Sequence, residues 1–136
     1  MLKSMLIHPQ ILSTLAASGH GGKVLIADGN YPFVTRANPH APRVYLNLAP
    51  GKLNVTDVLD AILTSIPVEA AHVMLTDNGS QPGIYPDFEA RLTVPLTPLK
   101  RDDFYGMAYD KDMALVIATG GKRLYANIIL TIGVVS

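Results

Sequence analysis

His20 and Asp28 are the two residues of this 136-residue sequence whose types and surroundings favour acid–base chemistry. His20 stands between Gly19 and Gly21, which allow a sharp turn that leaves the imidazole open. A histidine imidazole ordinarily titrates near neutral pH and can give or take a proton. Asp28 offers a carboxylate that can accept hydrogen bonds from a ligand or hold the imidazole. The alternatives are a surface histidine in a turn and an aspartate that caps the backbone of its own loop.

The segment that joins these two residues is expected to be a buried strand. Residues 23–27 read Lys-Val-Leu-Ile-Ala, an apolar run typical of a strand that is covered on both faces. In an open α/β sheet, ligands bind beyond the carboxyl ends of the strands. Asp28 ends this strand and a Gly-Asn-Tyr-Pro loop follows it, so we expect Asp28 to lie beside a ligand.

Buried strands alternate with amphipathic helices along the rest of the chain. Helical patterns occupy residues 9–18, 54–66, 86–92 and 102–108, and strand patterns occupy residues 43–48, 70–76, 94–99, 114–118 and 127–132. Two prolines favour an edge position for the 94–99 strand. Two glycines turn the chain between the last two strands, which favours a hairpin. The pattern predicts a single layered α/β domain over residues 1–136, with a mostly parallel central sheet and a C-terminal β-hairpin.

The composition argues against several classes of function. With 11 basic and 11 acidic residues and no basic block, the chain is not expected to bind nucleic acid. No apolar run approaches the ~20 residues of a membrane span, and no signal peptide is expected. The lack of cysteine excludes disulfides and thiolate metal sites and suits a reducing cytoplasm. No two histidines have helical metal-ligand spacing, so no metal is expected.

Two blocks of the sequence carry a family signature. The first joins Ser-Gly-His-Gly at residues 18–21 to Ala-Asp-Gly-Asn-Tyr-Pro at 27–32, and the second joins Ala-Thr-Gly at 118–120 to Leu-Tyr-Ala-Asn-Ile-Ile-Leu at 124–130. With both blocks at this separation, nearly the whole chain resembles the ribose pyranase and fucose mutarotase family of sugar-anomer enzymes. Arg-Asp-Asp-Phe-Tyr at 101–105 resembles the fucose branch, whereas alanine between Tyr125 and Asn127 resembles the ribose branch.

The resemblance implies interconversion of the ring forms of a reducing sugar, without a metal or an organic cofactor. It implies that His20 is the proton donor and that five further residues bind the sugar, Ala126 through its backbone: Asp28, Arg101, Tyr125, Ala126 and Asn127. It also implies a ring-shaped homo-oligomer, typically a decamer, in which a neighbouring subunit completes each active site. By residue type alone, Tyr125 and Asn127 are equally suited to capping the final hairpin, and Arg101 to a solvated helix start.

We therefore expect a cytoplasmic, cofactor-independent isomerase that acts on a monosaccharide, with L-fucose favoured. A D-ribose pyranase is the alternative within the same class of enzyme. A non-catalytic sugar-binding or transport-accessory protein on the same fold is the alternative from another class. An enzyme accelerates the exchange of sugar anomers, whereas a binding protein does not.

Overall fold

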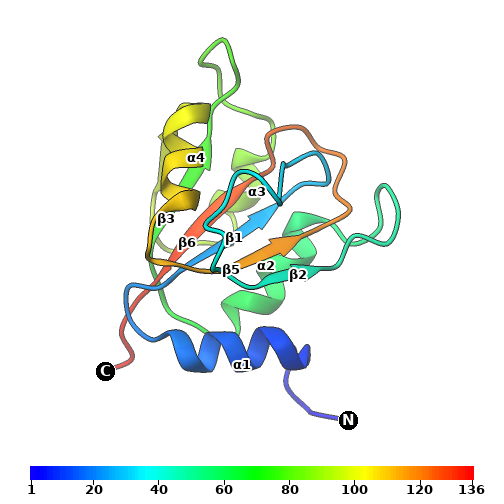
Figure 1. Ribbon diagram of the computed structural model, residues 1–136, viewed down its shortest axis with the longest axis vertical. Helices are drawn as coiled ribbons and strands as arrows, with labels where there is room; N and C mark the ends of the chain where they lie inside the picture. The colour runs from blue at the N-terminus through cyan, green and yellow to red at the C-terminus, as the bar shows by residue number, and fades with distance from the viewer.

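Six strands form one mixed sheet at the centre of the computed structural model, which describes residues 1–136 (Figure 1). The strands are β1 (Lys23–Ala27), β2 (Arg43–Tyr45), β3 (Val68–Met74), β4 (Leu96–Leu99), β5 (Met113–Ala118) and β6 (Ile128–Ile132). Their order across the sheet is β2-β5-β1-β6-β3-β4. All neighbours pair in parallel except β6, which runs antiparallel to both β1 and β3. The predicted α/β class with a mostly parallel sheet is confirmed.

Four helices cover the two faces of the sheet and make three layers. The helices are α1 (Pro9–Ser18), α2 (Val55–Leu63), α3 (Tyr85–Glu89) and α4 (Arg101–Tyr109). The first three pack their apolar side chains into one core, and α4 packs into the other together with residues 31–41. None of the four is long and apolar enough to cross a membrane.

Strand β1 serves both cores at once, which explains its uninterrupted apolar sequence. Val24 and Ile26 belong to the core under α1, α2 and α3, whereas Leu25 and Ala27 belong to the core under α4. All four residues are fully buried. Because β1 also has hydrogen-bonded neighbours on both edges, it fixes the position of whatever follows its carboxyl end.

The C-terminal β segment pairs differently from a simple hairpin. β6 returns antiparallel, as expected, but β1 lies between β5 and β6, so the two C-terminal strands pair with β1 and not with each other. Residues 119–127 cross the carboxyl end of β1 to make this connection. The physical reason is that β1 is apolar on both faces and is best buried at the centre of the sheet.

Several elements begin or end away from their expected positions. β2 stops at Tyr45 rather than continuing to residue 48, and β3 begins at Val68, before the expected residue 70. Helix α4 begins at Arg101, with Lys100 rather than Asp102 at the N-cap. Asp102 lies instead in the first turn, where an acidic side chain interacts favourably with the helix N-terminus.

Candidate functional site

A pocket of about 200 Å³ lies beyond the carboxyl end of β1. Its walls come from the loop after β1, the end of β3, the start of α4 and the loop before β6, and the residues are Asp28, Asn30, Tyr31, Pro32, Met74, Arg101, Tyr105, Leu124, Tyr125 and Asn127. Four residues with an expected role in binding are thus brought together from three separate segments of the chain: Asp28, Arg101, Tyr125 and Asn127.

Asp28 is the buried carboxylate of this pocket, with only 3% of its surface exposed. Its Oδ1 accepts the backbone N–H of Asn30 at 2.8 Å, and its own N–H donates to Oδ1 of Asn127 at 2.9 Å. Burial raises the pKa of the Asp28 carboxyl, and the hydrogen bonds donated to it act in the opposite direction. Asp28 therefore caps the backbone of its own loop, and it also lines the pocket, where its carboxylate can accept hydrogen bonds from a ligand.

The loop before β6 is tied to the end of β1 by hydrogen bonds. Gly29 N–H donates to the carbonyl of Gly121 at 2.8 Å, and Thr119 Oγ1 donates to the carbonyl of Ala27 at 2.8 Å. Gly120 packs directly under another loop, because a Cβ there would lie 2.3 Å from the carbonyl oxygen of Lys52. These contacts fix the path of the chain toward the pocket.

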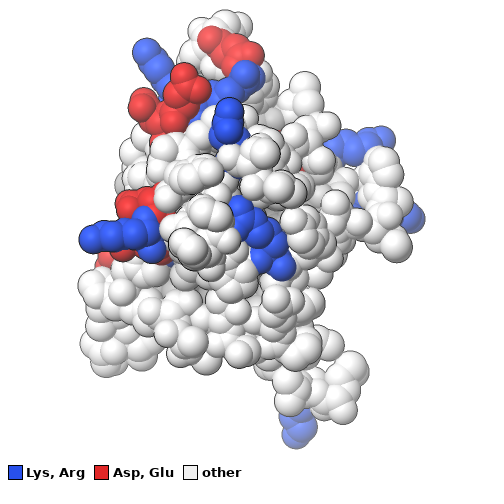
Figure 2. Space-filling view, viewed as in Figure 1, with Lys and Arg blue, Asp and Glu red and all other residues white.

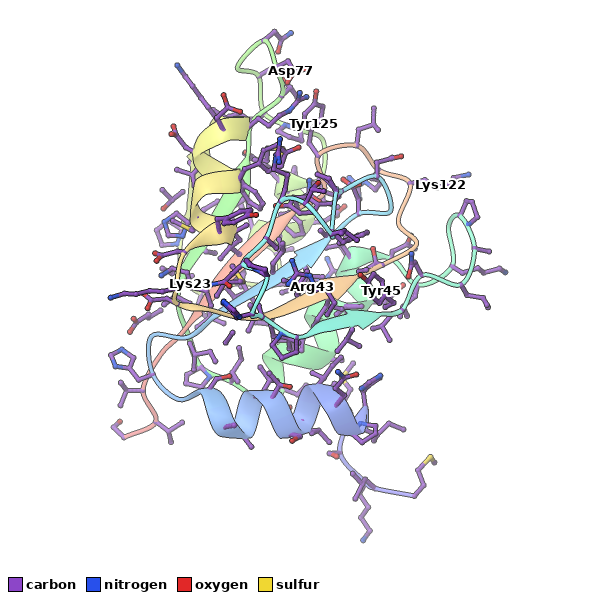
Figure 3. The ribbon with its side chains drawn as sticks, viewed as in Figure 1. Lys23, Arg43, Tyr45, Asp77, Lys122 and Tyr125 are labelled. Carbon is purple, nitrogen blue, oxygen red and sulfur yellow. The ribbon has the colours of Figure 1, made fainter.

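Tyr125 has an unusual backbone conformation at the pocket. Its φ is +60°, in the left-handed region that non-glycine residues rarely adopt. Such backbone strain tends to occur at functional sites, where the surrounding structure maintains it. Tyr125 lies well away from Lys23, the first residue of β1 (Figure 3). The conformation presents the phenol to the pocket, next to Arg101.

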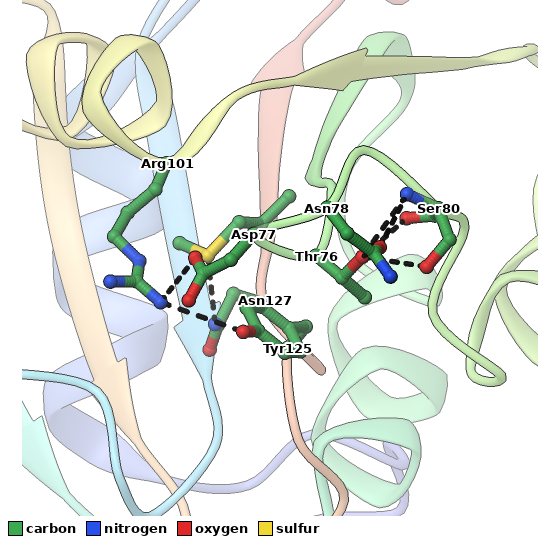
Figure 4. Close-up of polar contacts among 8 residues, drawn as sticks. Thr76, Asp77, Asn78, Ser80, Arg101, Tyr125 and Asn127 are labelled. Atoms are coloured by element: carbon green, nitrogen blue, oxygen red, sulfur yellow. Dashed lines mark hydrogen bonds and ion pairs between the residues drawn. The ribbon is translucent and has the colours of Figure 1, made fainter.

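Arg101 supplies the positive charge of the pocket. Its Nη2 lies 3.5 Å from the Tyr125 hydroxyl and 2.5 Å from Oδ1 of Asp77 (Figure 4). The carboxylate of Asp77 is the main cause that raises the pKa of Arg101, so the guanidinium stays protonated. The Arg101 side chain is 44% exposed and therefore lies at the mouth of the pocket rather than at its floor.

Aromatic rings form another wall of the pocket. The rings of Tyr31 and Tyr105 meet edge to face with 5.6 Å between centroids, and the guanidinium of Arg36 lies 5.7 Å from the Tyr105 centroid. The Tyr31 hydroxyl donates to the carbonyl of Arg36 at 2.6 Å. Burial raises the pKa of Tyr31, so this phenol remains a donor. The wall offers ring surface on which the C–H groups of a ligand can pack.

His20 lies at the other end of the sheet, before β1. Its Nε2 is 3.0 Å from Oε2 of Glu69, and its side chain is 58% exposed. The five residues of β1 at ~3.3 Å each put roughly 16 Å of strand between His20 and Asp28. Within one chain Asp28 therefore does not orient His20, and the contact partner of the imidazole is Glu69.

Ala126 lies between Tyr125 and Asn127 in the chain but does not line this pocket. The backbone of Ala126 acts to lower the pKa of the Asp28 carboxyl, against the larger effect of burial, and its buried side chain lines a separate small cavity beside the start of α2. The sequence assigned no role to Asp77, although it directly follows the strand expected at residues 70–76 as Asp28 follows the strand at 23–27, and the same strand-end rule would have found it. No group of three or more His, Asp or Glu side chains is arranged to hold a metal ion.

Comparisons with known proteins identify the family. Residues 1–135 match the RbsD / FucU transport protein family. The chain belongs to this family. Among its relatives, a D-ribose pyranase of Paracidovorax citrulli is 33% identical to this chain over 135 residues, which cover 98% of each protein.

Two solved structures carry the same fold. The fucose mutarotase of Streptococcus pneumoniae, in complex with L-fucose, has a TM-score of 0.78 at 32% identity and covers 96% of this chain and 95% of its own. RbsD of Bacillus subtilis, in complex with D-ribose, has a TM-score of 0.83 at 25% identity with 100% of both chains covered. Proteins similar to this chain are thus named both as pyranases and as mutarotases.

Proposed function

We propose that this chain is a sugar mutarotase that interconverts the anomers of L-fucose by acid–base-assisted ring opening and closure. The observation that carries the proposal is the convergence of Asp28, Arg101 and Tyr125, with Asn127, on one pocket. A sugar needs donors and acceptors for several hydroxyl groups at once. A carboxylate, a guanidinium, a phenol and an amide supply both kinds, and the aromatic wall suits the C–H face of the ring.

The proposed chemistry moves one proton from the anomeric hydroxyl to the ring oxygen. A neutral His20 imidazole removes the proton of the anomeric hydroxyl. As imidazolium, it then delivers that proton to the ring oxygen while the bond between C1 and the ring oxygen breaks. The open-chain aldehyde then rotates, and closure reverses the transfers. Acid–base catalysis of this kind contributes roughly 10² to 10⁴ in rate. In this scheme Asp28 and Arg101 hold the hydroxyl groups so that the anomeric carbon stays near the imidazole.

The proposed site includes a second copy of the chain. Because His20 lies at the opposite end of β1 from the pocket, its imidazole does not reach a sugar bound in the same chain. A homo-oligomeric ring, a decamer as the family resemblance implies, brings His20 of one subunit to the pocket of its neighbour. Exposed apolar side chains such as Val34, Tyr45 and Leu124 are consistent with such contacts.

The choice of L-fucose rests on the pocket's mixture of polar and apolar groups. Arg101 offers a fork of donors to adjacent hydroxyls. Met74 and Leu124 line the same pocket and give an apolar contact for the methyl group that L-fucose carries and D-ribose lacks. D-ribose pyranase activity is the second candidate, and the similarity to the Paracidovorax citrulli pyranase favours it.

Anomer exchange of L-fucose, D-ribose and D-galactose, followed by two-dimensional exchange NMR, tests the activity. Acceleration that depends on protein concentration supports an enzyme. Binding without acceleration supports the non-catalytic alternative, a sugar-binding protein, and contradicts the proposal.

Co-assembly of two inactive variants tests the shared site. Expressed separately, His20→Ala should lose at least ~10² in exchange rate, the low end of acid–base catalysis, and Asp28→Asn should lose most of its exchange activity through weakened sugar binding. When the two variants are expressed together and assemble at random, about one quarter of the sites combine a native His20 from one subunit with a native Asp28 from its neighbour. About one quarter of the wild-type activity should therefore return. Mixed assemblies no more active than the separate variants would rule out a site shared between subunits.

A further inference from the structure

Asp77 and Arg101 form an ion pair across the mouth of the pocket. Asp77 belongs to the loop between β3 and α3, and Arg101 is the first residue of α4. Oδ1 of Asp77 lies 2.5 Å from Nη2 of Arg101, and the same nitrogen lies 3.5 Å from the Tyr125 hydroxyl (Figure 4). Two elements that are separate in the sequence therefore meet at the guanidinium.

The loop that carries Asp77 is braced by its own hydrogen bonds. Thr76 Oγ1 donates to Oδ1 of Asn78 at 2.6 Å and also contacts the hydroxyl of Ser80 at 2.6 Å. The backbone N–H of Thr76 donates to the carbonyl of Ser80 at 3.1 Å. At the base, Leu75 N–H donates to the carbonyl of Leu99, two residues before Arg101. The backbone of Asp77 is therefore held at a fixed position relative to the start of α4.

Arg101 needs such an anchor if its guanidinium is to stay over the pocket. An arginine side chain is long and loses considerable rotamer freedom when it is held in one place. Asp77 engages a single nitrogen, so Nε and Nη1 remain free to donate to a ligand.

Other acidic side chains lie near Arg101, but only Asp77 holds it. Acidic and basic side chains gather where α4 begins and the 75–83 loop lies, whereas the surface over α1 in this view carries almost none (Figure 2). Asp102 and Asp103 belong to this group, and neither forms an ion pair. Proximity in the chain thus does not decide which carboxylate orients the guanidinium.

We propose that Asp77 is a positioning residue that holds Arg101 in the orientation in which it binds the sugar. This inference rests on the proposed function, because it takes the ligand of Arg101 to be a monosaccharide. Asp77 does not touch the reacting atoms. Its contribution is to sugar affinity, through the preorganised guanidinium, and not to proton transfer.

A double-mutant cycle with Arg101 separates this role from a structural one. We would measure KM and kcat for L-fucose by concentration-dependent exchange NMR, and Kd for L-fucose by calorimetry. Asp77→Ala should raise KM and Kd about three- to tenfold, the cost of ordering one mobile side chain, with kcat changed less than about twofold. Asp77→Asn should give KM and Kd values between those of the wild type and Asp77→Ala, because its amide keeps a polar oxygen beside the guanidinium but loses the charge of the ion pair. On an Arg101→Ala background, Asp77→Ala should have no further effect.

Asp102→Ala is the matched control, since it removes the same charge from the same edge and leaves the ion pair intact. Its KM and Kd should equal those of the wild type. Lower KM in Asp77→Ala would mean that Asp77 competes with the sugar, and an equal loss on the Arg101→Ala background would mean a structural role; either overturns the inference. If the wild type binds L-fucose without accelerating exchange, the proposed function fails and the Kd cycle still decides the role of Asp77. If the wild type neither binds L-fucose nor accelerates its exchange, both the proposed function and the role of Asp77 are overturned.

Discussion

The backbone N–H of Asp28 donates to the side-chain oxygen of Asn127 at 2.9 Å, which joins the end of β1 to the residue before β6. Both residues are almost completely buried and both line the pocket. The side-chain nitrogen of Asn127 has only a weak contact, with the sulfur of Met74 at 4.0 Å. The strong hydrogen bond of the Asn127 side chain is therefore the one that its oxygen accepts from Asp28. The site and the fold therefore share this contact, and a change there should affect both.

Asn127→Ala should destabilise the protein as well as weaken sugar exchange. The substitution leaves the buried N–H of Asp28 without a partner, which costs about 1 to 3 kcal/mol. Urea unfolding measures the loss. Asn47→Ala is the control, because Asn47 is exposed and its side chain makes no hydrogen bond, and it should change stability by less than about 0.5 kcal/mol. Equal unfolding midpoints for Asn127→Ala and the wild type would contradict the role of this bond.

Gly120→Ala should be strongly destabilising for a steric reason. The added Cβ would lie 2.3 Å from the carbonyl oxygen of Lys52 and 2.5 Å from that of Ala49, both backbone atoms that cannot rotate away. Overpacking of this kind costs about 1 to 3 kcal/mol or more. Gly83→Ala meets no atom within 4 Å and is the matched control. Thermal unfolding should give a lower midpoint for Gly120→Ala alone, and similar midpoints for the two variants would show that the loop can move aside.

The central strand and the place of Asp28 were predictable from the sequence, because both follow from local patterns. An apolar run at residues 24–27 requires burial on both faces, and the residue after such a strand lies at the ligand-binding edge. The roles expected for Arg101 and Tyr125 came from the family resemblance instead. Nothing in their local sequence indicates that α4 and the loop before β6 meet at one pocket.

The parts that were missed depend on long-range pairing. The position of β1 between β5 and β6 is decided by which strand is best buried, and a short glycine turn in the sequence gives no sign of it. The contacts of His20 with Glu69 and of Arg101 with Asp77 likewise join residues that are far apart in the chain. Helix and strand ends shifted by a few residues, because terminal turns depend on packing more than on pattern.

The pH dependence of stability should differ between the wild type and Asp28→Asn. Burial raises the pKa of Asp28 above its ordinary value of 3.8, so the folded state holds a proton at pH values where the unfolded chain has lost it. This group's stabilising contribution is therefore full below pH 3.8 and is lost as pH rises through the folded pKa. The amide introduced by Asp28→Asn carries no charge at any pH. The free energy of unfolding of Asp28→Asn, relative to the wild type, should therefore increase from pH 3 to pH 7.

Urea unfolding at several pH values measures this difference. Asp57→Asn is a suitable comparison, because Asp57 also accepts a backbone N–H, that of Asn54 at 2.8 Å, but lies at an exposed helix start. A difference between Asp28→Asn and the wild type that stays constant, or that shrinks as pH rises, would mean that the hydrogen bonds outweigh burial at Asp28.

Sugar preference is the property on which the fucose assignment depends, and Arg101 is the residue expected to set it. A guanidinium presents a rigid fork of donors, and a pocket built around such donors discriminates against sugars that leave them unpaired. We therefore expect the wild type to exchange L-fucose faster than D-ribose. Arg101→Ala should weaken L-fucose binding about tenfold or more and reduce this preference.

The same variant should leave stability almost unchanged, because the Arg101 side chain is 44% exposed and its ion pair with Asp77 is screened by solvent. Two-dimensional exchange NMR on both sugars, with urea unfolding of both proteins, measures the preference and the stability together. Arg123→Ala is the control: Arg123 pairs with Asp87 away from the pocket, so its loss should leave the ratio of fucose to ribose exchange unchanged. Faster exchange of D-ribose by the wild type would favour the pyranase alternative. An Arg101→Ala variant with an unchanged preference would remove Arg101 from sugar recognition.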